Sequence, residues 1–247
     1  MRQLDHGYGY GYGYGYGGPA CQYAASDDDS LSATYHPAPY YTEENYCNSG
    51  DDDDYYGDDD DNWCFAGSET VLLQSGATKA MRDVAVGDMV QVVGSDGSLS
   101  FSEVVFLPHG ANAERATFSE IQMASGKSLR ATPTHFVMAS ECGANAFELT
   151  AMQYVSAGHC VQTIAGEDEV TGTDMVVDRG VYTLVTKEAS GLVVVNGVHA
   201  SSFGGNHWLV NQYYNLHRAL YEVAPSLMTN RNVVAANLIV GDIGISL

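Results

Sequence analysis

The sequence predicts an all-β domain that follows a disordered leader and precedes a helical tail. Over residues 64–203, short apolar runs rich in β-branched residues alternate with turn residues, which is typical of strands. Upstream, Gly, Tyr and Asp dominate a stretch with little to bury, and downstream the apolar residues recur at helical spacing. We therefore expect three regions: a leader over 1–63, a β domain over 64–204 and a helical extension over 205–247.

The leader is acidic and repetitive. Gly-Tyr repeats fill 7–18, and runs of Asp occupy 27–29, 51–54 and 58–61. The leader holds 14 Asp and Glu with Arg2 as its single base, so it carries most of the formal net charge of −21. Such a composition cannot bury enough apolar surface to offset the loss of chain entropy, and we expect disorder. The charge also argues against nucleic acid and anionic membrane surfaces as partners.

The β domain is predicted from the length and composition of its apolar runs. They are short, rich in Val, Ile, Leu and Thr, and separated by turn signals such as Ser-Asp-Gly at 95–97. No long helical pattern intervenes, so the region reads as one all-β unit. The runs are TVLLQ (70–74), VQVVG (90–94), SEVVFL (102–107), FSEIQM (118–123), HFVMAS (135–140), VYTLVT (181–186) and LVVVNGV (192–198).

An internal repeat is visible within this unit. VAVGDMVQVV at 84–93 aligns with VSAGHCVQTI at 155–164, an offset of 71 residues. The same offset places SEVV at 102–105 against TDMV at 173–176. Similar strands in the same order indicate two β subdomains that arose by duplication and are related by a pseudo-twofold axis.

The tail is predicted to contain an amphipathic helix. Its polar face lacks the strongly basic character of helices that lie on membranes, and Pro225 is expected to end or kink it. The helix could pack on the β domain or bind a lipid, and we keep both interpretations. The apolar stripe, at alternating steps of four and three, is Leu209, Tyr213, Leu216, Leu220, Val223 and Leu227.

Cysteine usage and targeting signals exclude several classes. The chain has five cysteines, an odd number without a C-x-x-C pair, so we expect neither a zinc site nor a disulfide framework. The first residues lack the basic and apolar segments of a signal peptide, and no apolar stretch is long enough to span a bilayer. No metal ion or organic cofactor is implied.

Five sequence blocks, in order, resemble the Hint module of hedgehog C-terminal domains and, more distantly, inteins. The resemblance covers about 140 residues and implies the Hint fold of two pseudo-twofold-related β subdomains. The blocks are CFAGSETVLLQSGATKAMRDVAVGDMV (64–90), SEVVFL (102–107), GKSLRATPTHFV (126–137), VSAGHCV (155–161) and GLVVVNGVHASSF (191–203).

The first and third blocks carry the chemistry that the resemblance implies. The thiol of Cys64 attacks the carbonyl of Trp63 and forms a thioester, which splits one difficult step into two easier ones. The departing amine needs an acid within hydrogen-bonding reach. In the family a T-x-x-H block supplies it, and here Thr132 and His135 take these places, with the histidine protonating the Cys64 nitrogen and the threonine orienting the amide. Pro133 holds Thr132 in extended geometry.

Two departures from the family pattern bear on the second step. The family has an Asp that activates the sterol hydroxyl, and the matching position holds His109, which could act as a general base near pH 7 or be a surface-loop residue. The family's S-C-Y is Ser201-Ser202-Phe203 here, which removes the second thiol. The intein-type terminal His-Asn is also absent, so single cleavage is favoured over splicing.

The sequence therefore supports two hypotheses. The first is a single-turnover, self-acting cysteine autoprotease or acyl transferase that cuts Trp63–Cys64 in cis, with water or a sterol-like alcohol such as cholesterol as the acceptor. The second is a Hint fold that no longer cleaves and serves as a structural or interaction module carrying the acidic, tyrosine-rich segment. Membrane association is expected only through a lipid adduct, and secretion or the cell surface is implied by the resemblance alone.

Overall fold

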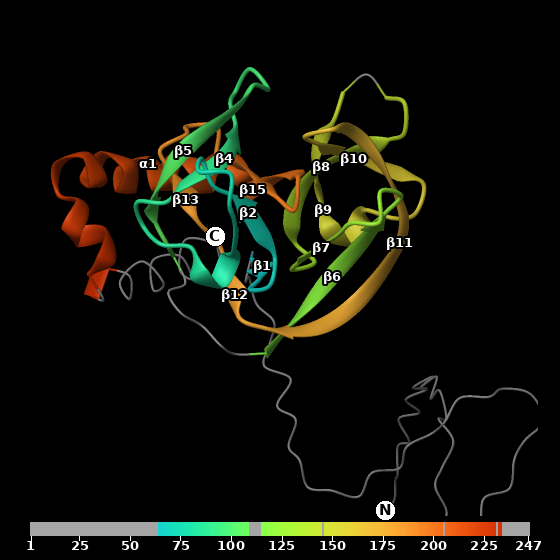
Figure 1. Cartoon of the computed structure of the whole chain (residues 1–247), viewed down its shortest axis with the longest axis horizontal. Coiled ribbons are helices and arrows are strands. Elements are labelled where there is room, and N and C mark those ends of the chain that lie inside the picture. Colours follow the sequence, from blue (N-terminus) through green and yellow to red (C-terminus); the bar gives the residue numbers. More distant parts are fainter. Residues whose placement is uncertain (1–63, 109–114, 145, 205, 231, 234–247) are drawn as a thin grey trace, which may run out of the picture. The chain divides into compact units, whose positions relative to one another are not determined.

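The computed structural model describes residues 64–233 except 109–114, 145, 205 and 231. The predicted leader, Trp63, His109 and the end of the tail lie outside the described residues. The domain is mostly β, as predicted, with a single-turn 3-10 helix before each of two strands and a helix after the last strand (Figure 1).

Within the described residues, fifteen strands form one continuously hydrogen-bonded sheet. Neighbouring strands pair antiparallel throughout, and the sheet bends around a shared core. The strands are β1 (Phe65–Ala66), β2 (Thr70–Leu72), β3 (Thr78–Ala80), β4 (Met89–Val93), β5 (Leu99–Phe106), β6 (Arg115–Met123), β7 (Ser128–Ala131), β8 (His135–Glu141), β9 (Glu148–Ala151), β10 (His159–Thr163), β11 (Gly166–Arg179), β12 (Val181–Tyr182), β13 (Val185–Thr186), β14 (Leu192–Val195) and β15 (Val198–Gly204).

The predicted repeat is confirmed by the order of these elements. The offset of 71 residues carries the 3-10 turn η1 (Met81–Asp83) onto η2 (Met152–Tyr154), residue for residue. A short strand precedes each turn, β3 or β9, and a long hairpin follows it, β4–β5 or β10–β11. The turns close in the same way, because Val84 donates its amide to Met81 and Val155 donates to Met152. The same local sequence pattern therefore forms the same turn in both halves.

The two halves are interlocked by strand exchange. β6, which leaves the first half, pairs along its length with β11 of the second half. β13 of the second half pairs with β5 of the first. Each half thus completes a hairpin of the other, and neither can be removed without exposing the backbone hydrogen-bonding groups of its neighbour.

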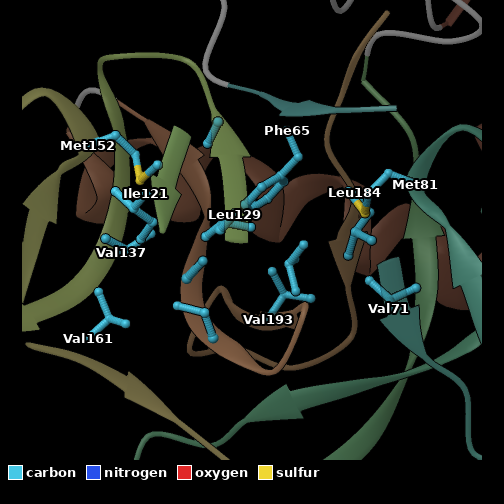
Figure 2. Packing of buried hydrophobic residues seen from close by; sticks show 14 of the residues in the cluster. Phe65, Val71, Met81, Ile121, Leu129, Val137, Met152, Val161, Leu184 and Val193 are labelled. Atoms are coloured by element: carbon cyan, nitrogen blue, oxygen red, sulfur yellow. The ribbon is translucent and has the colours of Figure 1, made fainter. Parts of the chain in front are cut away.

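One hydrophobic core serves both halves (Figure 2). Its side chains come from strands far apart in the sequence, and most are completely shielded from solvent. Burying each such side chain stabilises the fold by about 1.5–3 kcal/mol. The residues labelled in Figure 2 are Phe65, Val71, Met81, Ile121, Leu129, Val137, Met152, Val161, Leu184 and Val193.

The predicted tail helix is present as α1 (His207–Val223), and its side chains pack on the β domain. Asn206 caps it by accepting the amide of Leu209 at 3.1 Å, and the 3-10 turn η3 (Pro225–Thr229) follows. Packing of α1 on the β domain agrees with one of the two interpretations of the tail. Within the described residues, no helix is long and apolar enough to cross a bilayer.

The predicted buried stripe of this helix is wrong in part. Leu209, Leu216 and Val223 are 52%, 59% and 79% exposed. The buried face holds aromatic and polar side chains instead, because rings pack on Phe106 and Phe203 and a guanidinium reaches a strand carbonyl. The buried residues of α1 are Asn211, Tyr214, His217, Arg218 and Tyr221.

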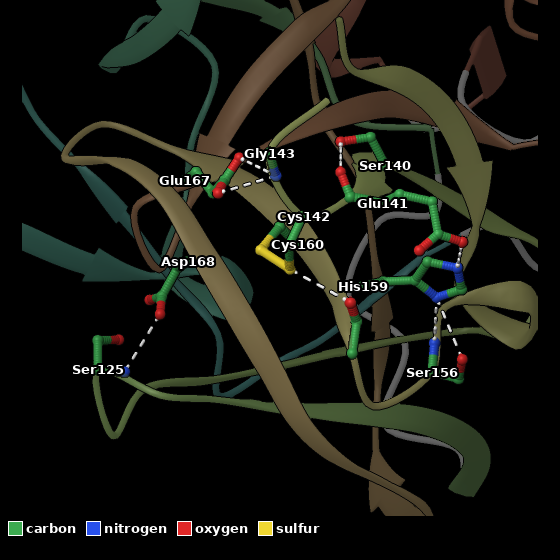
Figure 3. Close-up of a disulfide and its surroundings, with 11 residues drawn as sticks. Ser125, Ser140, Glu141, Cys142, Gly143, Ser156, His159, Cys160, Glu167 and Asp168 are labelled. Carbon is green, nitrogen blue, oxygen red and sulfur yellow. Dashed lines mark hydrogen bonds and ion pairs between the residues drawn. A yellow bond between two sulfur atoms is a disulfide. The ribbon is translucent and has the colours of Figure 1, made fainter. Parts of the chain in front are cut away.

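The expectation that the cysteines form no disulfide is also wrong. Cys142, just after β8, is bonded to Cys160 on β10, with their Cα atoms 4.8 Å apart (Figure 3). β8 and β10 are already paired beside the bond, since Cys160 lies opposite Ser140. The bond closes a loop of 18 residues, which restricts the unfolded chain and stabilises the fold by roughly 3 kcal/mol. The pair was not predicted because the chain has an odd number of cysteines, which argued against a disulfide framework.

Candidate active site

Cys64 and Thr132 are joined by two hydrogen bonds in opposite directions. The amide of Cys64 donates to the Thr132 hydroxyl at 3.1 Å, and the amide of Thr132 donates to the Cys64 carbonyl at 2.9 Å. Cys64 is fully buried and Thr132 is 5% exposed. One threonine thus binds both the amide and the carbonyl of Cys64, the residue whose nitrogen belongs to the predicted scissile bond.

His135 lies at the start of β8, immediately after the turn that carries Thr132. Its amide donates to the Thr132 carbonyl at 2.9 Å, and its ring packs against Phe65 with the ring centroids 4.1 Å apart. Ring nitrogen Nε2 lies 2.9 Å from the carbonyl oxygen of Ser201. A carbonyl oxygen only accepts, so Nε2 carries the hydrogen in this contact.

The local sequence explains this convergence. β1 is a two-residue strand wedged between two others, with Phe65 paired to Ala131 of β7 and to Tyr182 of β12. β7 ends at Ala131, and the next residues, Thr132 and Pro133, form the turn into β8. Pro133 cannot donate a ladder hydrogen bond, so the strand ends there and the threonine side chain is presented to Cys64.

The register of β1 and β12 also brings Thr183 to the site. Phe65 lies opposite Tyr182, so the next position in this antiparallel pair sets Cys64 opposite Thr183. Thr183 is 7% exposed, and its hydroxyl donates to the carbonyl of Ser202 at 2.5 Å. Nothing in the sequence distinguishes Thr183, because within VYTLVT it has the pattern of an ordinary strand residue.

The surroundings of Cys64 are apolar. It packs with Ala66, Phe118 and Val181 in a small cluster of buried residues. Burial raises the pKa of the Cys64 thiol far above its ordinary value, because the thiolate would be desolvated. The thiol is therefore neutral at physiological pH, and any attack by its sulfur requires a base that removes the proton as the new bond forms.

The predicted residues are distributed as follows. Cys64 hydrogen-bonds to Thr132, and the ring of His135 packs on Phe65, the residue after Cys64, whereas Trp63 and His109 lie outside the described residues. Ser202 is 1% exposed on β15, and in the part of the chain that the structure describes Cys64 is the free cysteine. That same part contains no group of three metal-ligating side chains.

Comparison with known proteins gives one family. A family model described as the Hint module matches residues 59–237. Warthog protein 6 of Caenorhabditis elegans is 27% identical over 144 residues, covering 56% of this chain and 24% of that protein. Protein hedgehog of Drosophila persimilis is 30% identical over 151 residues, covering 57% of this chain and 30% of that protein. The chain thus spans less than a third of either relative.

Solved structures of inteins are similar in arrangement. A DnaB intein from Synechocystis sp. PCC 6803 covers 57% of this chain and 98% of the intein, with 12% identity and a TM-score of 0.46. The gp41-1 intein covers 56% of this chain and 97% of the intein, with 13% identity and a TM-score of 0.44.

Proposed function

The chain belongs to the Hint module family, and from this premise we propose that it cleaves its own Trp63–Cys64 bond through a thioester on Cys64. The family contains autoprocessing domains of hedgehog proteins and inteins, which supports self-cleavage in general. The observation that carries the specific proposal is the reciprocal hydrogen-bonding of Cys64 and Thr132, with His135 packed on the neighbouring Phe65.

The first step moves the leader from nitrogen to sulfur. Nδ1 of His135 takes the proton of the Cys64 thiol while the sulfur attacks the carbonyl carbon of Trp63. The carbon–nitrogen bond then breaks, the thioester forms, and Nδ1 returns the proton to the Cys64 nitrogen. One imidazole suffices because its other nitrogen is committed to Ser201 and fixes the ring.

Thr132 orients the Cys64 amide during this step. The Cys64 N–H points at the threonine hydroxyl, so the lone pair that develops as the bond breaks is directed away from Thr132. That lone pair needs a separate proton donor, and His135 fills this role. Thr132 thereby holds the amide in the orientation that exposes its nitrogen to the imidazole.

The second step releases the leader. The thioester carbon is attacked by the oxygen of water or of a sterol-like alcohol, the carbon–sulfur bond breaks, and the Cys64 thiol is regenerated. The apolar cluster around Cys64 limits access of bulk water, which favours survival of the thioester until an acceptor arrives. Water gives a free carboxyl group on Trp63, and an alcohol gives an ester.

A non-cleaving Hint-fold module is the second candidate function. The complete burial of Cys64, with the raised pKa of its thiol, favours it, because a neutral and enclosed sulfur is a poor nucleophile without a competent base. In this case the domain would present the acidic, tyrosine-rich segment to a partner and leave the chain intact.

Expression of the full chain distinguishes self-cleavage from a non-cleaving module. The purified protein is incubated with and without dithiothreitol, and its fragments are analysed by denaturing gel and mass spectrometry. Cleavage after Trp63 that disappears in Cys64→Ala supports autoprocessing. A full-length chain under strong thiol, in protein that is folded by circular dichroism, supports the non-cleaving module.

A further inference from the structure

β15 carries a bulge opposite the start of β8. Ala200 pairs with Val137 and Gly204 pairs with His135, so three residues of β15 face one residue of β8. Bulges release a segment from the ladder and redirect its backbone groups. Here the released segment is Ser201–Phe203, and the strand it leaves is the one that begins at His135.

The bulge directs the Ser201 carbonyl to the imidazole. That carbonyl accepts Nε2 of His135 at 2.9 Å. The bulge is closed within itself by the Ser201 hydroxyl, which accepts the amide of Phe203 at 2.8 Å. The bulge is also joined to the loop before β14, because the Ser202 amide donates to the Gly191 carbonyl at 2.8 Å. Ser201 is therefore the residue whose side chain and main chain both define this geometry.

The first residue of α1 holds the same serine. Nδ1 of His207 lies 2.7 Å from the Ser201 hydroxyl, and its Nε2 lies 3.0 Å from the Ser190 carbonyl. Since the Ser190 carbonyl only accepts, Nε2 carries the hydrogen and Nδ1 accepts the hydroxyl proton of Ser201. Burial is the main cause that lowers the pKa of His207, and the Arg218 charge adds to it, so the ring is kept in this neutral form.

We propose that Ser201 and His207 form a positioning pair that aims the Ser201 carbonyl at His135, so that the first residue of helix α1 acts as a positioning residue for cleavage. The proposal rests on the cleavage function proposed above. Without the pair, the bulge loses its side-chain support, the carbonyl moves, and the ring of His135 samples its other tautomer. That tautomer protonates Nδ1, which then cannot accept the thiol proton.

Three variants distinguish this role from simple docking of the helix. His207→Phe keeps a ring beside Phe203 and removes both hydrogen bonds. His207→Asn keeps an acceptor in the place of Nδ1. Asn211→Leu is the matched control, because Asn211 ties α1 to the same loop through the Ala189 carbonyl at 2.7 Å and makes no hydrogen bond to Ser201.

The first measurement is the initial rate of dithiothreitol-induced cleavage of the full chain, at a temperature where each variant is folded. We expect His207→Phe to slow cleavage about 10- to 100-fold, as for a misplacement of a catalytic group by up to about 1 Å. His207→Asn should recover most of the rate, and Asn211→Leu should cleave like the wild type. A normal rate in His207→Phe, equal losses in His207→Phe and Asn211→Leu, or no recovery in His207→Asn would overturn the proposal.

The second measurement does not depend on cleavage. In the Cys64→Ala chain, the ¹⁵N shifts of the imidazole of His135 report its tautomer, with His135→Gln used to assign the signal. We expect a single Nε2–H form, and a mixture of tautomers when His207→Phe is added. An unchanged single form would overturn the proposal even if the wild type proved unable to cleave, whereas absence of wild-type cleavage with the expected tautomer shift would count against the proposed function alone.

Discussion

The amide nitrogen of Cys64 lies 3.1 Å from the hydroxyl of Thr132, and the amide of Thr132 lies 2.9 Å from the carbonyl oxygen of Cys64. This reciprocal pair joins residues 68 positions apart in the sequence. It determines which side of the Cys64 nitrogen is occupied and which side is left for a proton donor. The reactivity of the bond before Cys64 is therefore expected to depend on the threonine hydroxyl.

Removal of that hydroxyl should slow the first step. We expect Thr132→Val to reduce the rate of thiol-induced cleavage about 10-fold, because one buried hydrogen bond contributes about 1–1.5 kcal/mol. Thr132→Ser keeps the hydroxyl and serves as the control. A Thr132→Val chain that cleaves at the wild-type rate would show that the hydrogen bond does not guide the reaction.

His135 should matter more than Thr132, because in the proposed mechanism it is the group that moves the proton. We expect His135→Ala to lower the rate of thioester formation about 10²- to 10⁴-fold, the usual contribution of a general acid and base. Hydroxylamine trapping of the thioester measures this step apart from its hydrolysis. If the His135→Ala chain forms the trapped product at an undiminished rate, another group transfers the proton.

Glu69 should make the stability of the domain depend on pH. It is 5% exposed, and burial raises its pKa to about 7. Hydrogen bonds from the Arg130 main chain and Ser68 and the Arg130 charge lower that pKa by less, and the Glu120 charge raises it. Asn196, in a left-handed conformation at the β14–β15 turn, donates its side-chain amide to the Glu69 carboxyl group.

The sign of the effect follows from proton uptake. Between its ordinary pKa of 4.5 and about 7, the folded state keeps the Glu69 proton while the unfolded state has released it. Unfolding free energy therefore falls as the pH rises through this window, by about 3 kcal/mol in all. Glu69→Gln should remove this fall in urea titrations at pH 4.5 and 8. An identical decline in Glu69→Gln would exclude Glu69 as its source.

Glu103 offers a control of opposite sign. Hydrogen bonds from Lys187 and Tyr221 lower its pKa, so its ionised form stabilises the fold. That contribution is present above the unfolded pKa and is lost as the pH falls through the lower folded value. Glu103→Gln should therefore weaken the domain at pH 8 more than at acid pH, the reverse of Glu69→Gln.

The disulfide should stabilise the fold without taking part in cleavage. We expect the double change Cys142→Ser and Cys160→Ser to lower the unfolding free energy by roughly 3 kcal/mol, since it frees an 18-residue loop in the unfolded chain. Cleavage measured well below the melting temperature should be unchanged, because the bond links β10 to the far end of the strand that begins at His135. A loss of cleavage in a folded double variant would contradict this separation.

The sequence predicts the features that depend on local pattern. Each of the seven apolar runs overlaps at least one strand, although the longest strand, β11, lies in none of them. The repeat at an offset of 71 predicted the two halves, because each half repeats the same turn and hairpin. Cys64, Thr132 and His135 were identified from motif blocks, and the structure lays Cys64 against Thr132 and the ring of His135 against Phe65.

Features that depend on tertiary packing were missed. The buried face of α1 uses Tyr214 and Arg218, which no apolar periodicity marks, while Leu216 points to solvent. Ser201 and His207 meet only because of a bulge, and a change of strand register leaves no trace in composition. Thr183 lies opposite Cys64 through strand pairing alone. These residues required the three-dimensional arrangement.

Trapping of the acyl intermediate gives the sharpest test of a thioester on Cys64. The folded full chain is treated with hydroxylamine at neutral pH, and intact masses are recorded beside those of Cys64→Ala. We expect a fragment of residues 1–63 that ends in a Trp63 hydroxamate, together with a fragment that begins at Cys64, and neither fragment in the variant. A wild-type chain that keeps its full-length mass, like Cys64→Ala, would contradict the thioester.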